Sequence, residues 1–455
     1  MKIVYYVLIS FLGSTLISCN KDILNEKPDK SLVVPATLAD YEALLNNTTF
    51  VFGTDRKGMM EVLCGDHYVN LKDVLSASIS LRNGYRWQSD IYGEEISDED
   101  WFVSYRQVYN ANVVLDGLEK LDKNVQGEAV FNKVKGSAMF YRANAFWTLT
   151  QLYTKPYVKA NASTELGIPL RLSADFNKPS VRSTLEEAYR QILDDLLVAT
   201  ALLPLQQPYK TQPNKSAAWA LLARTALCMS DYEKALVYAE QCLSTSYQLL
   251  DFNELNAAAR FPIPDMNDEV IFRSTLTNYG ALFSVGVCKM DTALINAYHQ
   301  DDVRKSVFYV PNADGTYSFK GHYTGSSVPF GGITVAEVLL IKAECLARQG
   351  RLEEAQVTLE TLLIHRFKKN TLEKVPYESK EELLAQILLE RRKELVFKGI
   401  RWSDLRRLNL DSAFAVKLTR RIDGEEYELP PNDPRYTLMI HPAIIEMTGM
   451  QQNER

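Results

Sequence analysis

The chain has 455 residues, of which 46% are hydrophobic and 24% charged, an ordinary globular composition that excludes a disordered, collagen-like or coiled-coil chain. The 51 basic and 57 acidic residues give a net charge of −6, which offers no electrostatic reason to bind nucleic acid. Glycine and proline are scarce, at 21 and 17 residues, which favours long helices. Length alone would suggest about three domains.

The first nineteen residues predict export. A basic start, Met1-Lys2, precedes an apolar run of about fifteen residues, too short to span a bilayer and typical of a signal peptide over residues 1–18. Cys19 directly follows Leu-Ile-Ser, which resembles the lipobox of bacterial lipoproteins, where the cysteine becomes the acylated N-terminus. We therefore expect Cys19 to be the lipid anchor. The alternative is a cleaved signal with an incidental cysteine.

The body of the chain shows apolar residues at helical spacing. Ser183, followed three residues later by Glu186, predicts a capping box at the start of one helix, and Pro204 its end. The expected helical segments are 98–121, 128–153, 183–203, 217–243 and 337–363.

Two of these segments share an internal pattern. Ala223 and Ala235 are twelve residues apart, as are Ala343 and Ala355. Small residues at these points let the two helices of a hairpin approach closely, which is the tetratricopeptide pattern. We expect a mainly α fold with about four degenerate tetratricopeptide-like helix pairs.

Two segments interrupt the helical pattern, at about 62–96 and 252–332. The first contains Asn83-Gly84, a turn signal. The second is rich in proline and glycine, and Asn312-Ala313-Asp314-Gly315 predicts a hairpin between short aromatic runs. Loops inserted into a rigid scaffold often carry binding sites, so we place the ligand site in these insertions.

Charged residues dominate the segment 387–409. Glu390 and Glu394 lie one helical turn apart, and Gly399 is expected just after the helix. Paired carboxylates can serve acid–base catalysis. With arginines on either side, a salt-bridged helix–turn–helix is the better interpretation. The expected partners of the two glutamates are Arg401, Arg406 and Arg407.

This segment closely resembles the RagB/SusD family of outer-membrane nutrient-uptake lipoproteins. The matching residues are Glu390, Arg391, Glu394, Leu395, Phe397, Gly399, Arg401, Trp402, Asp404, Leu405, Arg406 and Arg407. Lys398 replaces the acid common in the family, at a position expected to be exposed. Further matches lie at 24–29, 38–45, 101–112, 135–153, 167–170 and 441–453, so the resemblance spans nearly the whole chain.

The resemblance implies a single SusD-like domain over residues 20–455, anchored in the outer membrane and facing the cell exterior. Such a protein sits as a lid on a SusC-like TonB-dependent β-barrel transporter. It captures an oligosaccharide and delivers it to the barrel, without catalysis and without a cofactor. Two alternatives stay open: a peptide-binding or adaptor protein of the same family, and a glycoside hydrolase.

The family motifs are architectural, so the ligand residues must be inferred from residue type. Sugar binding needs aromatic faces for the C–H side of the ring and polar groups for the hydroxyls. Trp87 is the leading candidate for a stacking platform. The other candidates are Tyr85, Tyr68, Asp66, Arg82 and Gln88, with Tyr279, Tyr317, Phe319 and Tyr323 from the second insertion. The alternative is that these aromatic residues pack the loops onto the helices.

The sequence carries no common signature of an enzyme or of a metal site. The sequence contains no GxSxG, HExxH, Walker or dinucleotide-binding motif. Its five histidines are isolated, and the five cysteines after Cys19 include no CxxC pair, so neither a zinc site nor a disulfide framework is predicted.

Overall fold

A computed structural model describes residues 35–55, 57–96, 98–123, 127–245, 248–283, 286–373 and 376–455. The expected signal peptide and Cys19 lie outside the described residues. The fold is mainly α, as predicted. The longer helices are α6 (Glu99–Leu118), α8 (Glu128–Tyr153), α9 (Leu185–Leu202), α10 (Lys215–Cys228), α11 (Tyr232–Leu243), α14 (Val335–Arg348), α15 (Leu352–Leu363) and α16 (Lys380–Glu394).

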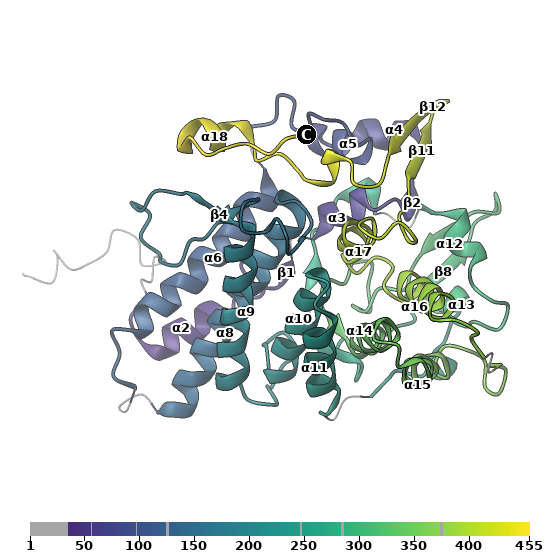
Figure 1. Ribbon diagram of the computed structural model, residues 1–455, viewed down its shortest axis with the longest axis horizontal. Helices are drawn as coiled ribbons and strands as arrows, with labels where there is room; N and C mark the ends of the chain where they lie inside the picture. The colour runs from purple at the N-terminus through teal and green to yellow at the C-terminus, as the bar shows by residue number, and fades with distance from the viewer. Residues whose placement is uncertain are drawn as a thin grey trace, which may run out of the picture.

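The long helices form a row that follows the order of the chain. Helix α6 packs on α8, α8 on α9, α9 on α10, α10 on α11, α11 on α14, and α14 on both α15 and α16. Figure 1 shows this row crossing the molecule from α6 to α16. The pairs α10–α11 and α14–α15 are the two related segments of the tetratricopeptide pattern. Ala223, Ala235, Ala343 and Ala355 are all fully buried, which allows the close approach predicted from their size.

The helix boundaries agree with the sequence pattern to within a few residues, but one cap was predicted wrongly. Thr184 caps α9, and its side chain accepts a hydrogen bond from the Glu187 N–H in a full capping box. Ser183 lies one residue before this cap, and its hydroxyl donates to the Ile168 carbonyl instead. Both residues satisfy the capping pattern, so only the surrounding structure selects between them.

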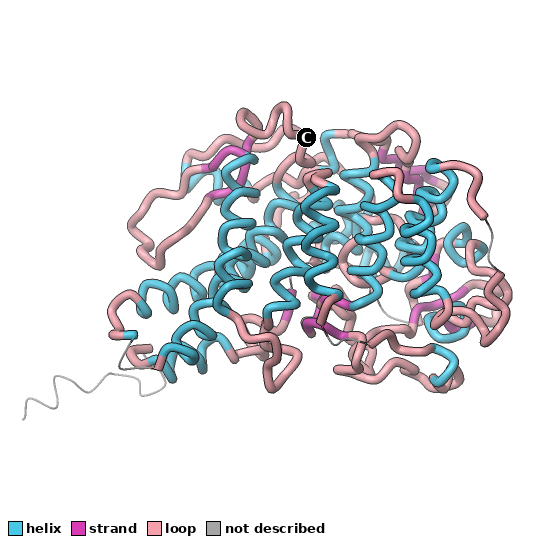
Figure 2. The backbone as a smooth tube through the Cα atoms, turned by 60° about the horizontal axis from the view of Figure 1, so that its bottom comes forward, coloured by secondary structure: helices cyan, strands magenta, loops and turns pink. Residues whose placement is uncertain are grey.

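Shorter elements surround the helical row. Figure 2 shows the strands and loops among them around the long helices. The shorter helices are α2 (Leu38–Leu45), α3 (Gly58–Leu63), α4 (Leu71–Ser76), α5 (Ile79–Tyr85), η1 (Phe252–Glu254), η2 (Gly280–Leu282), α12 (Thr292–Asn296), α13 (Arg304–Phe308), α17 (Arg401–Leu408), η3 (Pro434–Tyr436) and α18 (Pro442–Thr448). The paired strands are β1 (Thr54–Asp55) with β6 (Thr275–Leu276), β2 (His67–Tyr68) with β7 (Lys289–Met290), β3 (Leu166–Pro169) with β4 (Arg182–Thr184), β5 (Val270–Phe272) with β10 (Ile333–Thr334), β8 (Tyr309–Pro311) with β9 (Tyr317–Phe319), and β11 (Leu418–Ile422) with β12 (Glu425–Leu429). The β1–β6 pair is parallel and the others are antiparallel.

The two insertions differ in character. The first was expected to be irregular, but it contains α4, α5 and the end of α3, and Asn83-Gly84 lies inside α5 rather than in a hairpin turn. The second insertion carries the predicted hairpin. Its strands β8 and β9 are joined by a turn in which the Asn312 N–H donates to the Thr316 carbonyl and Gly315 has a φ of +80°.

The C-terminal motif is a buried ion-pair cluster with partners other than those predicted. Glu390 and Glu394 both pair with Arg304, and Glu394 also pairs with Arg366 at 3.0 Å. Neither pairs with Arg401, Arg406 or Arg407 among the described contacts. Arg407 binds Glu344 at 2.6 Å instead. The predicted pairing relied on proximity in the sequence. Arg304 and Arg366 instead belong to segments that lie well before the two glutamates in the chain.

Two local predictions in this motif were also wrong. Helix α16 ends at Glu394, so Gly399 does not directly follow it. Gly399 has a φ of +70°, and a Cβ there would lie 2.8 Å from the Lys57 Cβ, so the position requires glycine. Lys398 is buried rather than exposed, with its ammonium 3.9 Å from the centre of the Tyr323 ring.

Buried apolar side chains from Leu38 to Met450 form one contiguous core. Trp101, Trp147 and Trp402 lie in it, and Trp219 packs partly buried against it. No helix within the described ranges combines the length and the apolar character needed to cross a bilayer. The single-domain organisation stays a prediction.

Candidate functional site

The leading candidate for a sugar platform is buried. Trp87 is 0% exposed, and its indole N–H donates to the Leu63 carbonyl at 3.0 Å. Tyr85 is equally buried, and its hydroxyl accepts from the Val69 N–H. The Arg420 guanidinium, from β11, lies 4.4 Å from the Trp87 ring centre and 3.8 Å from that of Tyr85. The expectation that these rings face a ligand is therefore wrong in this structure.

Three further candidates belong to the interior. Asp66 is buried and forms an ion pair with Arg392 at 2.7 Å. Phe319 stacks on Phe397 with ring centres 5.0 Å apart. Tyr323 is fully buried and donates to Glu269 at 3.0 Å. Asp66 and Phe319 thus hold the two insertions against α16 and the turn after it, whereas Tyr323 is held within the second insertion.

The remaining candidates are accessible but do not form one site. Tyr68 is 37% exposed on β2, and Tyr317 is half-buried on β9; both strands adjoin β7. Arg82 is half-buried in α5, and Gln88 is exposed just after that helix. Tyr279 alone among the candidates lines a described pocket that both insertions share.

This pocket, which we call the insertion pocket, has a volume of about 320 Å³. It opens at the N-terminus of α6, where the first insertion meets Tyr279 of the second. Its lining residues are Met59, Ser78, Ser80, Leu81, Ile91, Tyr92, Glu95, Ile96, Asp98, Glu99, Asp100, Tyr153, Tyr279 and Leu438.

Carboxylates supply the charge of the insertion pocket. Asp98 caps α6 by accepting from the N–H groups of Asp100 and Trp101, and it also accepts from the hydroxyls of Tyr92 and Tyr153. Burial raises the pKa of Asp98, while these hydrogen bonds act in the opposite direction. Both carboxylate oxygens of Asp100 lie 2.6 Å from the Tyr279 hydroxyl. Asp98 and Asp100 are therefore held rigidly.

The more accessible polar groups of the pocket are different residues. Glu99 and Ser78 are exposed, while Glu95 and Ser80 are half-buried. The Glu95 carboxylate accepts from the Ser80 N–H at 3.1 Å, which leaves acceptor capacity for another donor. Carboxylates and hydroxyls of this kind suit the hydroxyl groups of a sugar.

An apolar pocket of about 430 Å³ adjoins the insertion pocket and shares Ile96 and Asp98 with it. Its accessible aromatic faces come from α6, where Phe102 is 62% exposed and Tyr109 is 49% exposed. Phe176, from the loop between β3 and β4, lies in the same wall. The two pockets together offer aromatic faces next to hydroxyl-binding groups.

Apart from Tyr279, the residues that line the two pockets are not among the candidates predicted from the sequence, although a signal for some of them exists. Phe102 and Tyr109 are seven residues apart on α6, beside the stripe of Trp101, Tyr105 and Val108. An apolar face this wide exceeds what one neighbouring helix covers, so part of it must face solvent or a ligand. No local pattern predicts that Tyr279 reaches Asp100, because 179 residues separate them.

The described residues contain no group of three or more histidine, cysteine, aspartate or glutamate side chains arranged to hold a metal ion. The described cysteines, Cys64, Cys228, Cys242, Cys288 and Cys345, are all buried free thiols.

Several solved structures share the fold. A SusD superfamily protein from Bacteroides thetaiotaomicron VPI-5482 aligns with a TM-score of 0.76 at 22% identity, covering 92% of this chain and 100% of its own. A SusD superfamily protein from Bacteroides fragilis gives 0.72 at 24% identity, covering 89% and 96%. A SusD-like carbohydrate binding protein from Bacteroides vulgatus ATCC 8482 gives 0.69 at 20% identity, covering 91% and 97%. At these identities the likeness concerns the fold. No curated protein matches the chain.

Two family models match the sequence itself. One, SusD-like, is described as "Starch-binding associating with outer membrane" and matches residues 22–227. The other is the model of the SusD family, which includes RagB. It matches residues 296–439 and so includes the ion-pair motif around Glu390 and Glu394. Each match covers a different half of the same helical row. The chain therefore belongs to the SusD/RagB family.

Proposed function

We propose that this protein captures a glycan at the cell surface and delivers it to a TonB-dependent β-barrel transporter of the outer membrane. The family description, starch-binding and associated with the outer membrane, supports this role, as does the fold shared with a carbohydrate binding protein. Cys19 would anchor the mature chain in the membrane, facing outward.

The observation that carries the proposal is the pairing of the insertion pocket with its apolar neighbour. Glu95, Glu99 and Ser78 can accept or donate hydrogen bonds to sugar hydroxyls, while Phe102 and Tyr109 offer flat apolar faces. Tyr279 supports the polar side through Asp100. A glycan lying across the shared wall at Ile96 would meet both kinds of surface.

Two of the four carboxylates that line the insertion pocket, Asp98 and Asp100, are held in ways that argue against a catalytic role. A glycosidase uses two carboxyl groups that exchange protons or attack the sugar. In this pocket Asp98 already accepts four hydrogen bonds, from two tyrosines and two backbone N–H groups. Asp100 is held by Tyr279. Neither is placed as an available acid or base. The accessible pair, Glu95 and Glu99, is tested by the assay for released sugar described below.

Affinity electrophoresis of the mature protein through gels containing single polysaccharides tests the proposal. We expect retardation without release of reducing sugar. Phe102→Ala should weaken binding about threefold to tenfold, because stacking on one aromatic ring is worth roughly 0.5–1.5 kcal/mol. Tyr209→Ala is the matched control, since Tyr209 is 63% exposed and lies outside both pockets.

Three outcomes would contradict the proposal. Equal retardation of Phe102→Ala and the parent protein would reject this site. Release of sugar products would identify a hydrolase. Binding of peptides in place of every polysaccharide would favour the peptide-binding alternative.

A further inference from the structure

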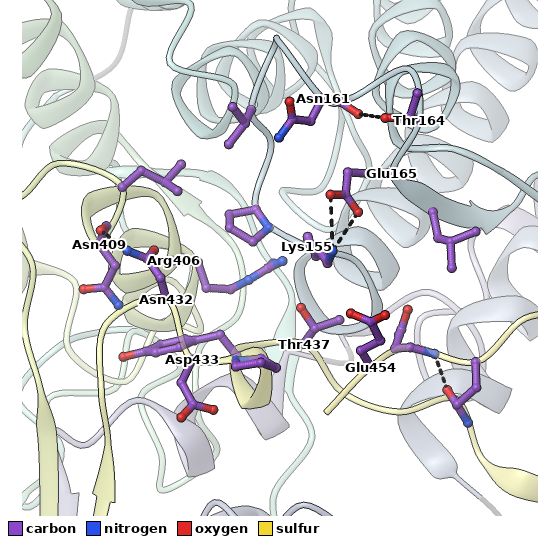
Figure 3. Close-up of a pocket in the computed structure, with 18 of the residues that line it drawn as sticks. Lys155, Asn161, Thr164, Glu165, Arg406, Asn409, Asn432, Asp433, Thr437 and Glu454 are labelled. Atoms are coloured by element: carbon purple, nitrogen blue, oxygen red, sulfur yellow. Dashed lines mark hydrogen bonds and ion pairs between the residues drawn. The ribbon is translucent and has the colours of Figure 1, made fainter.

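A third pocket, larger than the two described above, is lined by residues that directly follow the C-terminus of α8. Its volume is about 550 Å³, within the usual range of roughly 300–1,000 Å³ for small-molecule sites. Its walls come from residues 155–166, the end of α17, and the segments 432–437 and 451–454 (Figure 3). It shares no lining residue with the insertion pocket, and we call it the C-terminal pocket.

Arg406 is a buried cation in the wall of this pocket. Its Nη atoms donate to the carbonyls of Gln151 and Thr154, which satisfies the free carbonyls at the end of α8. It forms no ion pair with any described residue, and its Nε has no hydrogen-bond partner there. Figure 3 shows the side chain reaching from α17 into the middle of the pocket. Burial lowers the pKa of Arg406 to about 10, so the group stays charged at neutral pH.

Two other buried polar groups in the same wall lack a hydrogen bond of normal geometry. These are the side-chain nitrogen of Asn409 and the hydroxyl of Tyr436, each on a residue only 3% exposed. Burial raises the pKa of Tyr436 to about 12, while the adjacent Asn409 amide acts in the opposite direction. Buried polar groups almost always have a partner in folded proteins. The Asn409 amide and the Tyr436 hydroxyl act on each other and have no surface open to the pocket. The polar groups that a molecule in the pocket can reach include the side-chain amides of Asn161, Asn432 and Gln451, which are exposed and both donate and accept hydrogen bonds.

The charges of the wall restrict the chemistry of that molecule. The cations are Lys155 and Arg406, and the carboxylates are Glu165, Asp433 and Glu454. Glu165 is bridged to Lys155 at 3.0 Å. An anionic ligand would meet three carboxylates, and an amine would meet two cations. A hydroxyl group both donates and accepts, so it suits each member of the wall.

We propose that the C-terminal pocket is a second ligand site, which binds a neutral, hydroxyl-rich molecule such as one or two units of an uncharged sugar. The site is separate from the insertion pocket and does not depend on it. A glycan chain held at both sites would gain avidity without any new contact, provided that it can span them.

Saturation-transfer NMR on the mature protein in detergent tests this site. The probes are cellobiose, lactose and maltose, with glucuronic acid and glucosamine as charged comparators, each at up to about 20 mM. Leu410 is 43% exposed and lines the pocket, so Leu410→Trp should obstruct it without disturbing the core. Asn161→Ala removes an exposed polar group of the same wall. Both substitutions are made in the Phe102→Ala protein, because Phe102→Ala weakens the proposed glycan region and so isolates the signal of the C-terminal pocket.

We expect the Phe102→Ala protein, in which the proposed glycan region is weakened, to retain transfer to at least one neutral disaccharide. Adding Leu410→Trp should reduce this remaining transfer fivefold or more, and adding Asn161→Ala should weaken it. The charged sugars should give weaker transfer than the neutral ones. Absence of transfer to every neutral probe in the Phe102→Ala protein would overturn the proposal, as would a signal there that survives the added Leu410→Trp or a stronger signal from a charged sugar. A signal lost only in Phe102→Ala would assign binding to the region of the proposed function instead.

Discussion

Arg420 explains why two aromatic residues of the first insertion serve packing rather than recognition. Its guanidinium lies over the rings of both Tyr85 and Trp87 and donates to the carbonyls of Tyr85 and Val62. A buried cation needs such partners, because burial disfavours its charged form. The hairpin β11–β12 that carries Arg420 thereby covers the face that a sugar would need.

Replacement of Trp87 separates the structural role from the ligand-binding one. Trp87→Phe removes the indole N–H and leaves the Leu63 carbonyl without its donor, at a cost of about 1–3 kcal/mol. We expect a lower free energy of unfolding in urea titrations but unchanged retardation in polysaccharide gels. Phe102→Ala should show the reverse pattern. Loss of retardation in Trp87→Phe at unchanged stability would restore Trp87 as a ligand residue.

At the scale of elements, the sequence predicts the long helices better than the short ones. Helix α8 spans Glu128–Tyr153, which matches its predicted range, because 26 residues show several turns of apolar periodicity. Helices α4 and α5 have six and seven residues, too few for a periodic signal. Short helices of this kind depend on tertiary packing, so the sequence pattern predicts an irregular first insertion where the structure has helices.

One contact between elements makes a contribution to folding stability that depends on pH. Glu61 of α3 accepts from the Gly399 N–H in the turn between α16 and α17, and burial raises the pKa of Glu61 to about 8. The native state therefore keeps a proton that the unfolded chain releases near pH 4.5. The contribution of Glu61 to stability is complete below about pH 4.5 and is lost progressively as the pH rises to about 8.

Glu61→Gln should remove this dependence, because the amide keeps an acceptor for Gly399 and does not titrate. Between pH 5 and pH 8, the difference in unfolding free energy between the variant and the parent should move in favour of the variant, by on the order of a few kcal/mol. Urea titrations at several pH values measure this difference. A difference that stays constant with pH would contradict the assignment to Glu61.

At the scale of the whole molecule, a buried network joins the second insertion to the helical row. Its cations are Arg304, Arg366, Lys393 and Lys398, and its carboxylates are Glu269, Asp302, Glu390 and Glu394. Glu394 lies at the centre, between Arg304 and Arg366. The network balances its charges only when all of these segments are in place.

Glu394→Gln should therefore destabilise the fold strongly, by about 3–5 kcal/mol, because it leaves buried arginine charge uncompensated. Glu354→Gln is the matched control, since Glu354 pairs with Arg351 at the surface, where such a pair is worth about 0–1 kcal/mol. Chemical denaturation measures both. Equal small effects of the two substitutions would show that the network contributes little to stability.

The sequence by itself determined the mainly α fold, the long helices and the family, because periodicity and the motif at 390–407 are local in the chain. Only the tertiary structure decided which side chains are accessible. Trp87 and Tyr279 both lie in segments without long helices, yet a distant hairpin buries one and Asp100 holds the other at a pocket. Exposure depends on contacts between residues hundreds of positions apart, and no local pattern of residue types encodes those contacts.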